Sequence, residues 1–223
     1  MKVAIMQPTF FPWVGYFSLI KAVDLFVFLD DVEYSHQSWQ TRNHFCILGQ
    51  SQWLSIPVSS STKTIIKDVK IHNPKRFLNK MHRTLQQSYA KAGNSSLLPL
   101  FFDYIENINV EMLGDFNIEV IKFFTKYLDI NTQFLKSSML EIEGAKNDKV
   151  NSILHAVSAS RYICAPGSRD YMIEFGLDKF CCPVEFYDYA NSVRVSNANK
   201  YGNNMSIFDT VMFYSKKKIL CEI

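Results

Sequence analysis

Two adjacent carboxylates are the groups in this sequence that are best placed to accept a proton. Asp30 and Asp31 follow Leu25–Leu29, an apolar run with the length of a buried strand. A carboxylate held near a substrate amine can act as a general base. Side chains alternate along a strand, so we expect the two acids to point to opposite faces. We predict that Asp30 or Asp31 is the base, with Asp30 preferred because it lies nearest the strand end, and with His36 behind it; the alternative is that both acids cap the following turn.

Groups that could hold an anion follow the two acids within a dense polar segment, residues 30–43. The Arg42 guanidinium can bind a phosphate or a carboxylate through two hydrogen bonds, and the Asn43 amide lies beside it in the sequence. Tyr34 could orient a sugar or an acyl donor. We therefore predict substrate-binding roles for Tyr34, Arg42 and Asn43. The alternative for Arg42 is a surface ion pair with Asp31.

The elements that would position these groups form an α/β opening unit. Val3–Met6 is predicted to be a strand that ends at Gln7, and a turn containing Gly15 and a helical apolar pattern lead into the strand before the acids. Ligands in such folds bind at the carboxyl ends of the strands. We therefore expect Gln7 and Asp30 to share a cleft, with Gln7 and Tyr16 orienting the substrate.

The turn after the first strand is neither a dinucleotide-binding loop nor a Walker loop, because it has one glycine and no Gly-Lys-Ser/Thr. It is aromatic instead. Its rings could form the floor of a sugar or base pocket, or they could belong to the core, as large aromatic residues commonly do. The residues concerned are Phe10, Phe11, Trp13, Tyr16 and Phe17.

A second strand–turn–helix unit lies late in the chain. Tyr162–Ala165 is predicted to be a strand, followed by a Pro-Gly-Ser turn and a helix that includes Tyr171. Backbone N–H groups at such a turn can bind an anion. Gly167 and Ser168 are therefore candidates for stabilising the oxyanion of an acyl-transfer reaction. The alternative is that Ser168 only caps the helix.

The remaining pattern completes a single α/β domain over residues 1–223. We expect a layered, mostly parallel sheet with flanking helices and an opening unit like that of nucleotidyltransferases and Rossmann folds. Asn73 and Pro74 should start one helix, and Ser206 with Asp209 should form the capping box of another. Residues 191–204 are expected to form a loop or lid. Further strands are expected at Trp53–Val58, Val69–His72, Thr132–Leu135 and Pro183–Tyr189.

Composition favours a cytoplasmic globular protein. The 223 residues are 48% hydrophobic with a net charge of +3, and no apolar run approaches the roughly 18 residues that span a bilayer. No signal-peptide pattern follows Lys2. Lys and Arg are scattered apart from Lys216–Lys218, so we expect no nucleic-acid or membrane partner. The five cysteines lack zinc-ligand spacing, so no metal is expected.

Six motifs, taken in order, resemble the WbqC-like family and cover essentially the full chain. The opening motif is the most specific of them. They are QPTFFPWVGYFSLI, LFVFLDDVEY, WQTRN, WLSIPV, APGSRDYM and MSIFDTVMF. Two segments depart from the family pattern, residues 165–168 and the stretch VRVSNANKYG. Both fall where substrate contacts are expected, which indicates that the substrate can differ within the family.

The resemblance implies a role in the synthesis of bacterial O-antigen or another surface polysaccharide. The implied activity is that of an acyltransferase or a glycine-type aminoacyltransferase that modifies an amino sugar in its nucleotide-linked form. The small-molecule substrate would then be a nucleotide-sugar. The donor stays open between a thioester, carried by an acyl carrier protein or coenzyme A, and an amino acid activated with ATP.

A second similarity concerns the opening unit alone. Its strand, Pro-Thr and Gly-aromatic pattern is similar to the start of adenylate-forming and nucleotidyl-transferring enzymes, which carry an HxGH motif there. The stretch PWVGY has no histidine, so another group would have to stabilise the transition state. Two alternatives to the transferase follow. One is an enzyme that uses ATP to activate an amino acid or transfer a nucleotidyl group, and the other is a non-catalytic protein that binds nucleotide-sugars.

Overall fold

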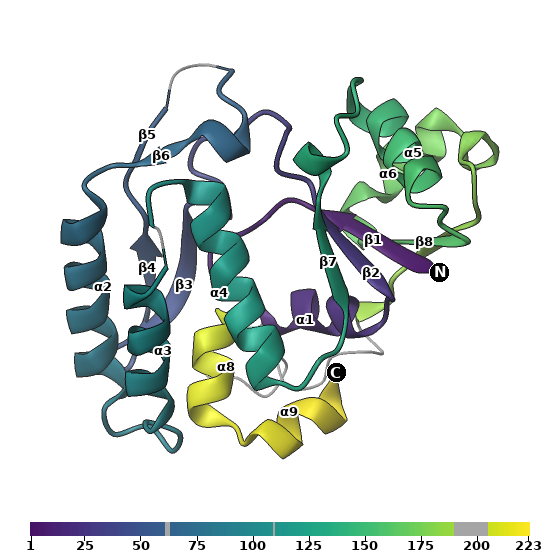
Figure 1. The fold of residues 1–223 in the computed structure, drawn as a ribbon. Coiled ribbons are helices and arrows are strands. Elements are labelled where there is room, and N and C mark those ends of the chain that lie inside the picture. Colours follow the sequence, from purple (N-terminus) through teal and green to yellow (C-terminus); the bar gives the residue numbers. More distant parts are fainter. Residues whose placement is uncertain (61–62, 109, 190–204) are drawn as a thin grey trace.

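Five parallel strands form the central sheet of the computed structural model, which describes residues 1–60, 63–108, 110–189 and 205–223 (Figure 1). Their order across the sheet is β7-β2-β1-β8-β9. The apolar runs of β1 and β2 are typical of strands that are buried on both faces of a parallel sheet. The expected α/β fold with a mostly parallel sheet is therefore confirmed. The strands are β1 (Lys2–Met6), β2 (Leu25–Phe28), β7 (Gln133–Lys136), β8 (Arg161–Cys164) and β9 (Val184–Phe186).

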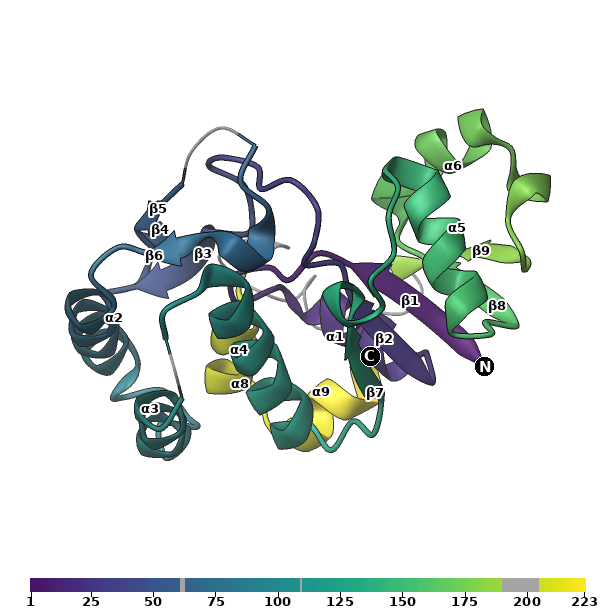
Figure 2. The ribbon, with the colours of Figure 1, turned by 45° about the horizontal axis from the view of Figure 1, so that its top comes forward.

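Alternating strand residues divide the core into two clusters. Ala4 and Phe26 lie in the larger cluster with residues of α1, α4 and α8, whereas Val3 and Val27 lie in the smaller cluster with residues of α5 and α6. Helices therefore cover both faces of the sheet, and Figure 2 shows α5 and α6 together at the end away from α2 and α3. The helices are α1 (Val14–Lys21), α2 (Pro74–Tyr89), α3 (Leu97–Glu106), α4 (Leu113–Tyr127), α5 (Lys146–Ala156), α6 (Arg169–Phe175), α8 (Ile207–Phe213) and α9 (Lys216–Glu222).

A lobe of two small sheets and three helices separates β2 from β7 in the sequence. Strands β3 (Arg42–Ile47) and β4 (Gln50–Ser55) form one antiparallel hairpin, and β5 (Val58–Ser59) pairs with β6 (Lys70–Ile71). Apolar side chains of this hairpin and of α2, α3 and α4 join the larger core cluster. The lobe and the central sheet consequently share one continuous core.

The aromatic turn after β1 belongs to this core. Phe10, Phe11, Tyr16 and Phe17 are all buried, and the Phe11 ring makes edge-to-face contacts with aromatic rings from α3 and α8. The alternative that these four rings form the floor of an open pocket is therefore wrong. Trp13 is only partly buried and packs on Tyr189.

The expected helix starts are confirmed, and several other boundaries are corrected. The Asn73 side chain accepts a hydrogen bond from the Arg76 N–H at 3.2 Å, and the Ser206 hydroxyl accepts one from the Asp209 N–H at 3.3 Å. The strand expected at Trp53–Val58 lies earlier, at β4, and it pairs with β3, whose first two residues, Arg42 and Asn43, end the predicted polar segment. Lys216–Lys218 begins α9. The predicted loop or lid at residues 191–204 and the VRVSNANKYG departure lie outside the described residues.

Candidate active site

The carboxyl ends of β1 and β2 lie side by side. The two strands pair in parallel with Met6 opposite Phe28, and the Leu29 N–H donates to the Met6 carbonyl at 2.8 Å. Gln7 and Asp30 therefore follow neighbouring strands at one edge of the sheet, as expected. Ser137 and Ser138 follow β7, the next strand along, so four polar residues meet at this edge.

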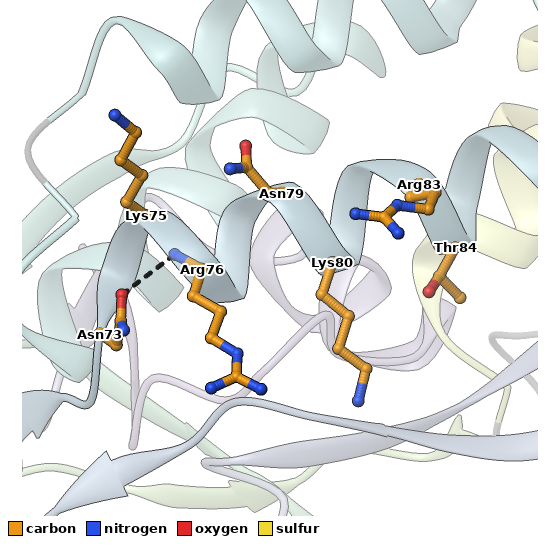
Figure 3. Close-up of a pocket in the computed structure, with 7 residues that line it drawn as sticks. All are labelled: Asn73, Lys75, Arg76, Asn79, Lys80, Arg83 and Thr84. Carbon is orange, nitrogen blue, oxygen red and sulfur yellow. Dashed lines mark hydrogen bonds between the residues drawn. The ribbon is translucent and has the colours of Figure 1, made fainter.

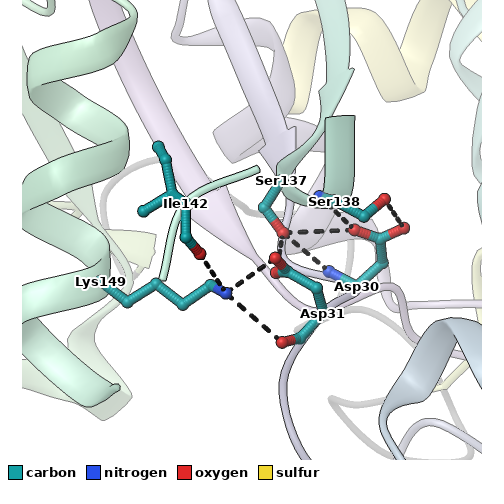
Figure 4. Close-up of polar contacts among 6 residues, drawn as sticks. All are labelled: Asp30, Asp31, Ser137, Ser138, Ile142 and Lys149. Atoms are coloured by element: carbon teal, nitrogen blue, oxygen red, sulfur yellow. Dashed lines mark hydrogen bonds and ion pairs between the residues drawn. The ribbon is translucent and has the colours of Figure 1, made fainter. Parts of the chain in front are cut away.

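Asp30 and Asp31 converge on one hydroxyl group instead of pointing to opposite faces (Figure 4). The Ser137 Oγ lies 3.2 Å from Asp30 Oδ1, and it donates a still shorter hydrogen bond to Asp31 Oδ1. The expectation of opposite faces is wrong because β2 ends at Phe28. Strand alternation no longer applies two residues beyond that end.

Asp30 fixes the turn that follows β7. Its carboxylate accepts hydrogen bonds from the Ser138 N–H at 3.0 Å and the Ser138 hydroxyl at 2.8 Å, and its own N–H donates to Ser137 Oγ at 3.2 Å. The residue is only 2% exposed. Asp30 thus caps the short 3₁₀ turn Ser137–Met139. The alternative, that both acids cap the turn directly after them, differs from this arrangement, because Asp30 caps a turn that is distant in sequence.

Asp31 forms a buried ion pair with Lys149 of α5. The Lys149 Nζ lies 2.7 Å from Asp31 Oδ2 and 3.1 Å from the Ile142 carbonyl, and the side chains of Lys149 and Asp31 are 7% and 12% exposed. The alternative ion pair between Asp31 and Arg42 is therefore wrong. Lys149 supplies a fixed positive charge beside Asp31, whose carboxylate is more accessible than that of Asp30.

Sequence reasoning missed both serines and the lysine, for different reasons. Ser137 and Ser138 follow the strand predicted at Thr132–Leu135, so the rule that singled out Gln7 and Asp30 would have found them too. Lys149 directly precedes the apolar stripe of its helix and resembles any solvent-facing lysine. No sequence signal marks it, because only the tertiary packing of α5 against the sheet buries it.

A second polar group surrounds Gln7. The Gln40 side-chain N–H donates to Gln7 Oε1 at 2.7 Å, and the Asn117 amide donates to the carbonyls of Pro8 at 3.2 Å and Gln40 at 2.9 Å. Asn117 is fully buried, and within the described part of the chain its Oδ1 has no hydrogen-bond partner. The Tyr16 hydroxyl donates to the Gln7 carbonyl at 3.1 Å, and burial raises the pKa of this phenol well above its usual value. Tyr16 therefore fixes backbone, which weighs against the predicted contact with substrate.

Asn43 is a structural residue in this arrangement. It is buried, and its amide donates to the carbonyls of Phe10 at 3.2 Å and Phe11 at 2.7 Å. Phe11 has a φ of 44°, a left-handed conformation that a bulky L-residue rarely adopts. The Asn43 amide holds that strained turn. Its predicted role in binding an anion is therefore corrected.

The other residues predicted on the polar segment do not join the acids. The Arg42 guanidinium lies 4.6 Å from the centroid of the Trp53 ring. Tyr34 is buried, with its ring centroid 4.9 Å from that of the exposed His36. Among the residues that the structure describes, no hydrogen bond links His36 to Asp30 or Asp31. His36 thus has no observed position behind the base.

The late Gly167–Ser168 turn is only partly suited to an oxyanion. The Ser168 N–H already donates to the Ala165 carbonyl at 3.1 Å, which weighs against its predicted role. The Ser168 hydroxyl makes no cap hydrogen bond to α6, so the capping alternative fails as well. Burial raises the pKa of the nearby Cys164 thiol, and a hydrogen bond with Ser168 opposes that rise. Gly167 stays a prediction.

An open concavity of about 650 Å³ lies elsewhere, on the exposed face of α2 (Figure 3). Four of its lining residues are cations, and in the described ranges none of them forms an ion pair. The expectation that basic residues form no concentrated face is therefore corrected for this helix. The lining residues are Asn73, Lys75, Arg76, Asn79, Lys80, Arg83 and Thr84.

Fold and site together define an α/β protein whose parallel sheet carries acids, hydroxyls and a buried lysine at its carboxyl edge. The model of the WbqC-like protein family matches residues 7–221, and the chain belongs to that family. It is 28% identical over 194 residues to a protein of Mycobacterium tuberculosis (strain ATCC 25618 / H37Rv) named "Uncharacterized protein Rv1507c", covering 84% of this chain and 82% of the relative. No solved structure matches.

Two further features bear on the expected chemistry. Within the described ranges, no helix has the length and apolar character needed to cross a bilayer. In the same part of the chain, no group of three or more His, Cys, Asp and Glu side chains is arranged to hold a metal ion, and the five cysteines form no disulfide.

Proposed function

We propose that this protein transfers an acyl or aminoacyl group, of the glycine type, to the amine of a nucleotide-linked amino sugar in O-antigen or other surface-polysaccharide synthesis. Family membership supports the biosynthetic setting that the sequence resemblance implied. The observation that carries the proposed chemistry is the buried Asp31–Lys149 pair at the carboxyl edge of the sheet.

The reaction joins the amine nitrogen to the carbonyl carbon of a thioester. A C–N bond forms, the C–S bond breaks, the thiol leaves, and the amine loses a proton to a base. Asp31 is the proposed base. The Ser137 hydroxyl donates to its Oδ1 and Lys149 donates to its Oδ2, so the carboxylate has a fixed orientation while each oxygen keeps a lone pair.

Asp31 replaces Asp30 as the favoured base for two reasons. Asp30 is almost completely buried and already accepts two hydrogen bonds from Ser138, one from its N–H and one from its hydroxyl. Asp31 has the more exposed side chain of the two, so a substrate amine can reach its carboxylate more easily. Asp30 is then a positioning residue, which holds the Ser137 hydroxyl against Asp31.

The test is a product assay by mass spectrometry with two donor arms. One arm contains a glycyl thioester of pantetheine, the other contains glycine with ATP and Mg²⁺, and each includes nucleotide-linked amino sugars as acceptors. If the protein is the proposed transferase, the acceptor should gain one glycyl residue in the thioester arm, without ATP. Pyrophosphate release in the second arm would instead identify an ATP-dependent enzyme. Ligand binding without product in either arm would contradict transfer and identify a binding protein.

A further inference from the structure

Two half-exposed tryptophans lie in contact beside the β3–β4 hairpin, Trp53 on β4 and Trp39 in the loop before β3. Trp39 and Trp53 are 47% and 46% exposed, with ring centroids 5.6 Å apart and planes inclined by 45°. Large aromatic side chains usually bury most of their surface in a core. Two of them side by side on a surface are typical of a site where another planar or apolar group stacks.

His44 and Arg42 extend this surface on the same side of the hairpin. They are two residues apart on β3, and His44 pairs directly with Trp53 across the ladder. The His44 ring centroid lies 3.7 Å from that of Trp53, and the Arg42 guanidinium lies 4.6 Å from it. Ser51 Oγ lies 3.2 Å from His44 Nδ1 and fixes that ring. The four side chains Trp39, Arg42, His44 and Trp53 are called the aromatic face below.

The charge around the aromatic face favours an anionic ligand. Residues 39–55, which form the loop before β3 and the hairpin, contain no Asp or Glu, and their charged side chain is Arg42, whose guanidinium lies against the Trp53 ring. On the face of the hairpin that carries Trp53, positions 42, 44, 51, 53 and 55 include no carboxylate or amide side chain to bind the hydroxyl groups of a sugar, whereas the exposed Gln50 and Gln52 belong to the other face. A stacking surface beside one guanidinium group matches a ligand that combines a planar base with phosphate.

The aromatic face is joined directly to the candidate site. The Trp39 carbonyl accepts a hydrogen bond from the Phe10 N–H at 2.8 Å, and the next residue, Gln40, donates to Gln7. Gln40 is buried at the carboxyl edge while Trp39 is exposed beside it. One loop therefore holds a stacking surface next to the groups that end β1.

We propose that the aromatic face binds the nucleotide moiety of the nucleotide-linked amino sugar. The base stacks on Trp39 and Trp53, and Arg42 binds the phosphates. This inference rests on the proposed function, because that function supplies the nucleotide. It adds a ligand class and a site for it: a nucleoside diphosphate on the outward surface of the hairpin.

The test is a titration with nucleoside diphosphates that is monitored by calorimetry and by tryptophan fluorescence. Stacking of the base on Trp39 and Trp53 should quench that fluorescence. Trp53→Ala and Trp39→Ala should each raise the Kd about 5- to 150-fold, the effect expected for one lost base-stacking partner. Trp53→Phe keeps a ring and should retain most of the affinity. Leu48→Ala, which alters another exposed apolar residue on the same hairpin, should leave the Kd unchanged. Circular dichroism checks that each variant is folded.

Several outcomes would overturn the inference about the aromatic face and leave the proposed transferase activity uncontradicted. Equal nucleotide affinity in the parent protein and all tryptophan variants would place the nucleotide elsewhere. Transfer to a free amino sugar, with no nucleotide binding at millimolar concentration, would do the same. Single-stranded oligonucleotides that bind far more tightly than mononucleotides would assign the aromatic face to nucleic acid. Conversely, stacking without transfer from any donor would support the aromatic face and contradict the proposed activity.

Discussion

Folding buries the opposite charges of Asp31 and Lys149 next to each other. Removing either side chain leaves the other charge buried without a partner, which lowers the stability of the folded protein. Breaking a buried pair by truncating one partner typically destabilises a protein by about 3–5 kcal/mol, whereas removing both charges is often close to neutral. The two side chains are 12% and 7% exposed and fall in this regime. A double-mutant cycle can therefore separate the structural role of Asp31 from its proposed role as a base.

We predict that Asp31→Asn and Lys149→Met each lower the free energy of unfolding by about 3–5 kcal/mol, and that the double variant regains most of that loss. Activity should not return with stability. The double variant still lacks the base, so its kcat should stay about 100- to 10,000-fold below that of the parent protein. Urea unfolding and the glycyl-transfer assay measure the two quantities. Recovery of both stability and kcat in the double variant would show that Asp31 is only structural.

At the scale of elements, sequence periodicity was sufficient where a local pattern decided the structure. The strands β1, β2, β7, β8 and β9 and the capped starts of α2 and α8 could all be predicted, because each depends on residues close in sequence. The β3 strand could not. Its buried Asn43 interrupts the expected pattern, and the reason for that burial lies 32 residues away, at the Phe11 carbonyl. The same limit applies to Lys149 in the site.

Asp209 links three elements through one buried carboxylate. Its Oδ1 accepts hydrogen bonds from the Tyr89 hydroxyl of α2 at 2.7 Å and the Cys46 N–H of β3 at 2.8 Å, and its Oδ2 accepts one from Ser206 at 2.6 Å. Burial raises the pKa of Asp209 from its ordinary value of 3.8 to about 6, and the hydrogen bonds from Ser206, Tyr89 and Cys46 oppose that rise. The folded protein therefore holds this proton more tightly than the unfolded chain.

The direction of the resulting pH dependence follows from that shift. Stability from the protonated Asp209 is fully present below the unfolded pKa near 4, and it is lost as pH rises through the folded pKa near 6. A shift of about two pKa units corresponds to roughly 3 kcal/mol. We predict that Asp209→Asn, which stays neutral, gains stability relative to the parent protein between pH 4 and pH 7.5. Urea unfolding of both proteins across this range measures it, and a difference that does not change with pH would contradict the prediction.

At the scale of the whole molecule, the positive charges are concentrated in one part of the chain, which the small net charge of +3 does not reveal. Residues 34–102 contain nine Lys and Arg but a single acid, Asp68. Within this stretch, α2 contains Lys75, Arg76, Lys80 and Arg83 and no acid. Its apolar stripe packs into the core, so only the charged face meets water. A concentrated cationic face of this kind attracts anions far more strongly than the same charges dispersed.

We predict that binding to a cation-exchange matrix depends mainly on this helix. A variant with Lys75, Arg76, Lys80 and Arg83 all changed to Gln should elute at clearly lower salt than the parent protein. The matched control changes four exposed lysines that lie outside α2 to Gln, namely Lys126, Lys146, Lys179 and Lys217. Both variants lose the same formal charge, but clustered charges act together within the Debye length of about 10 Å at 0.1 M salt. The control should therefore shift much less, and equal shifts would show that net charge alone governs retention.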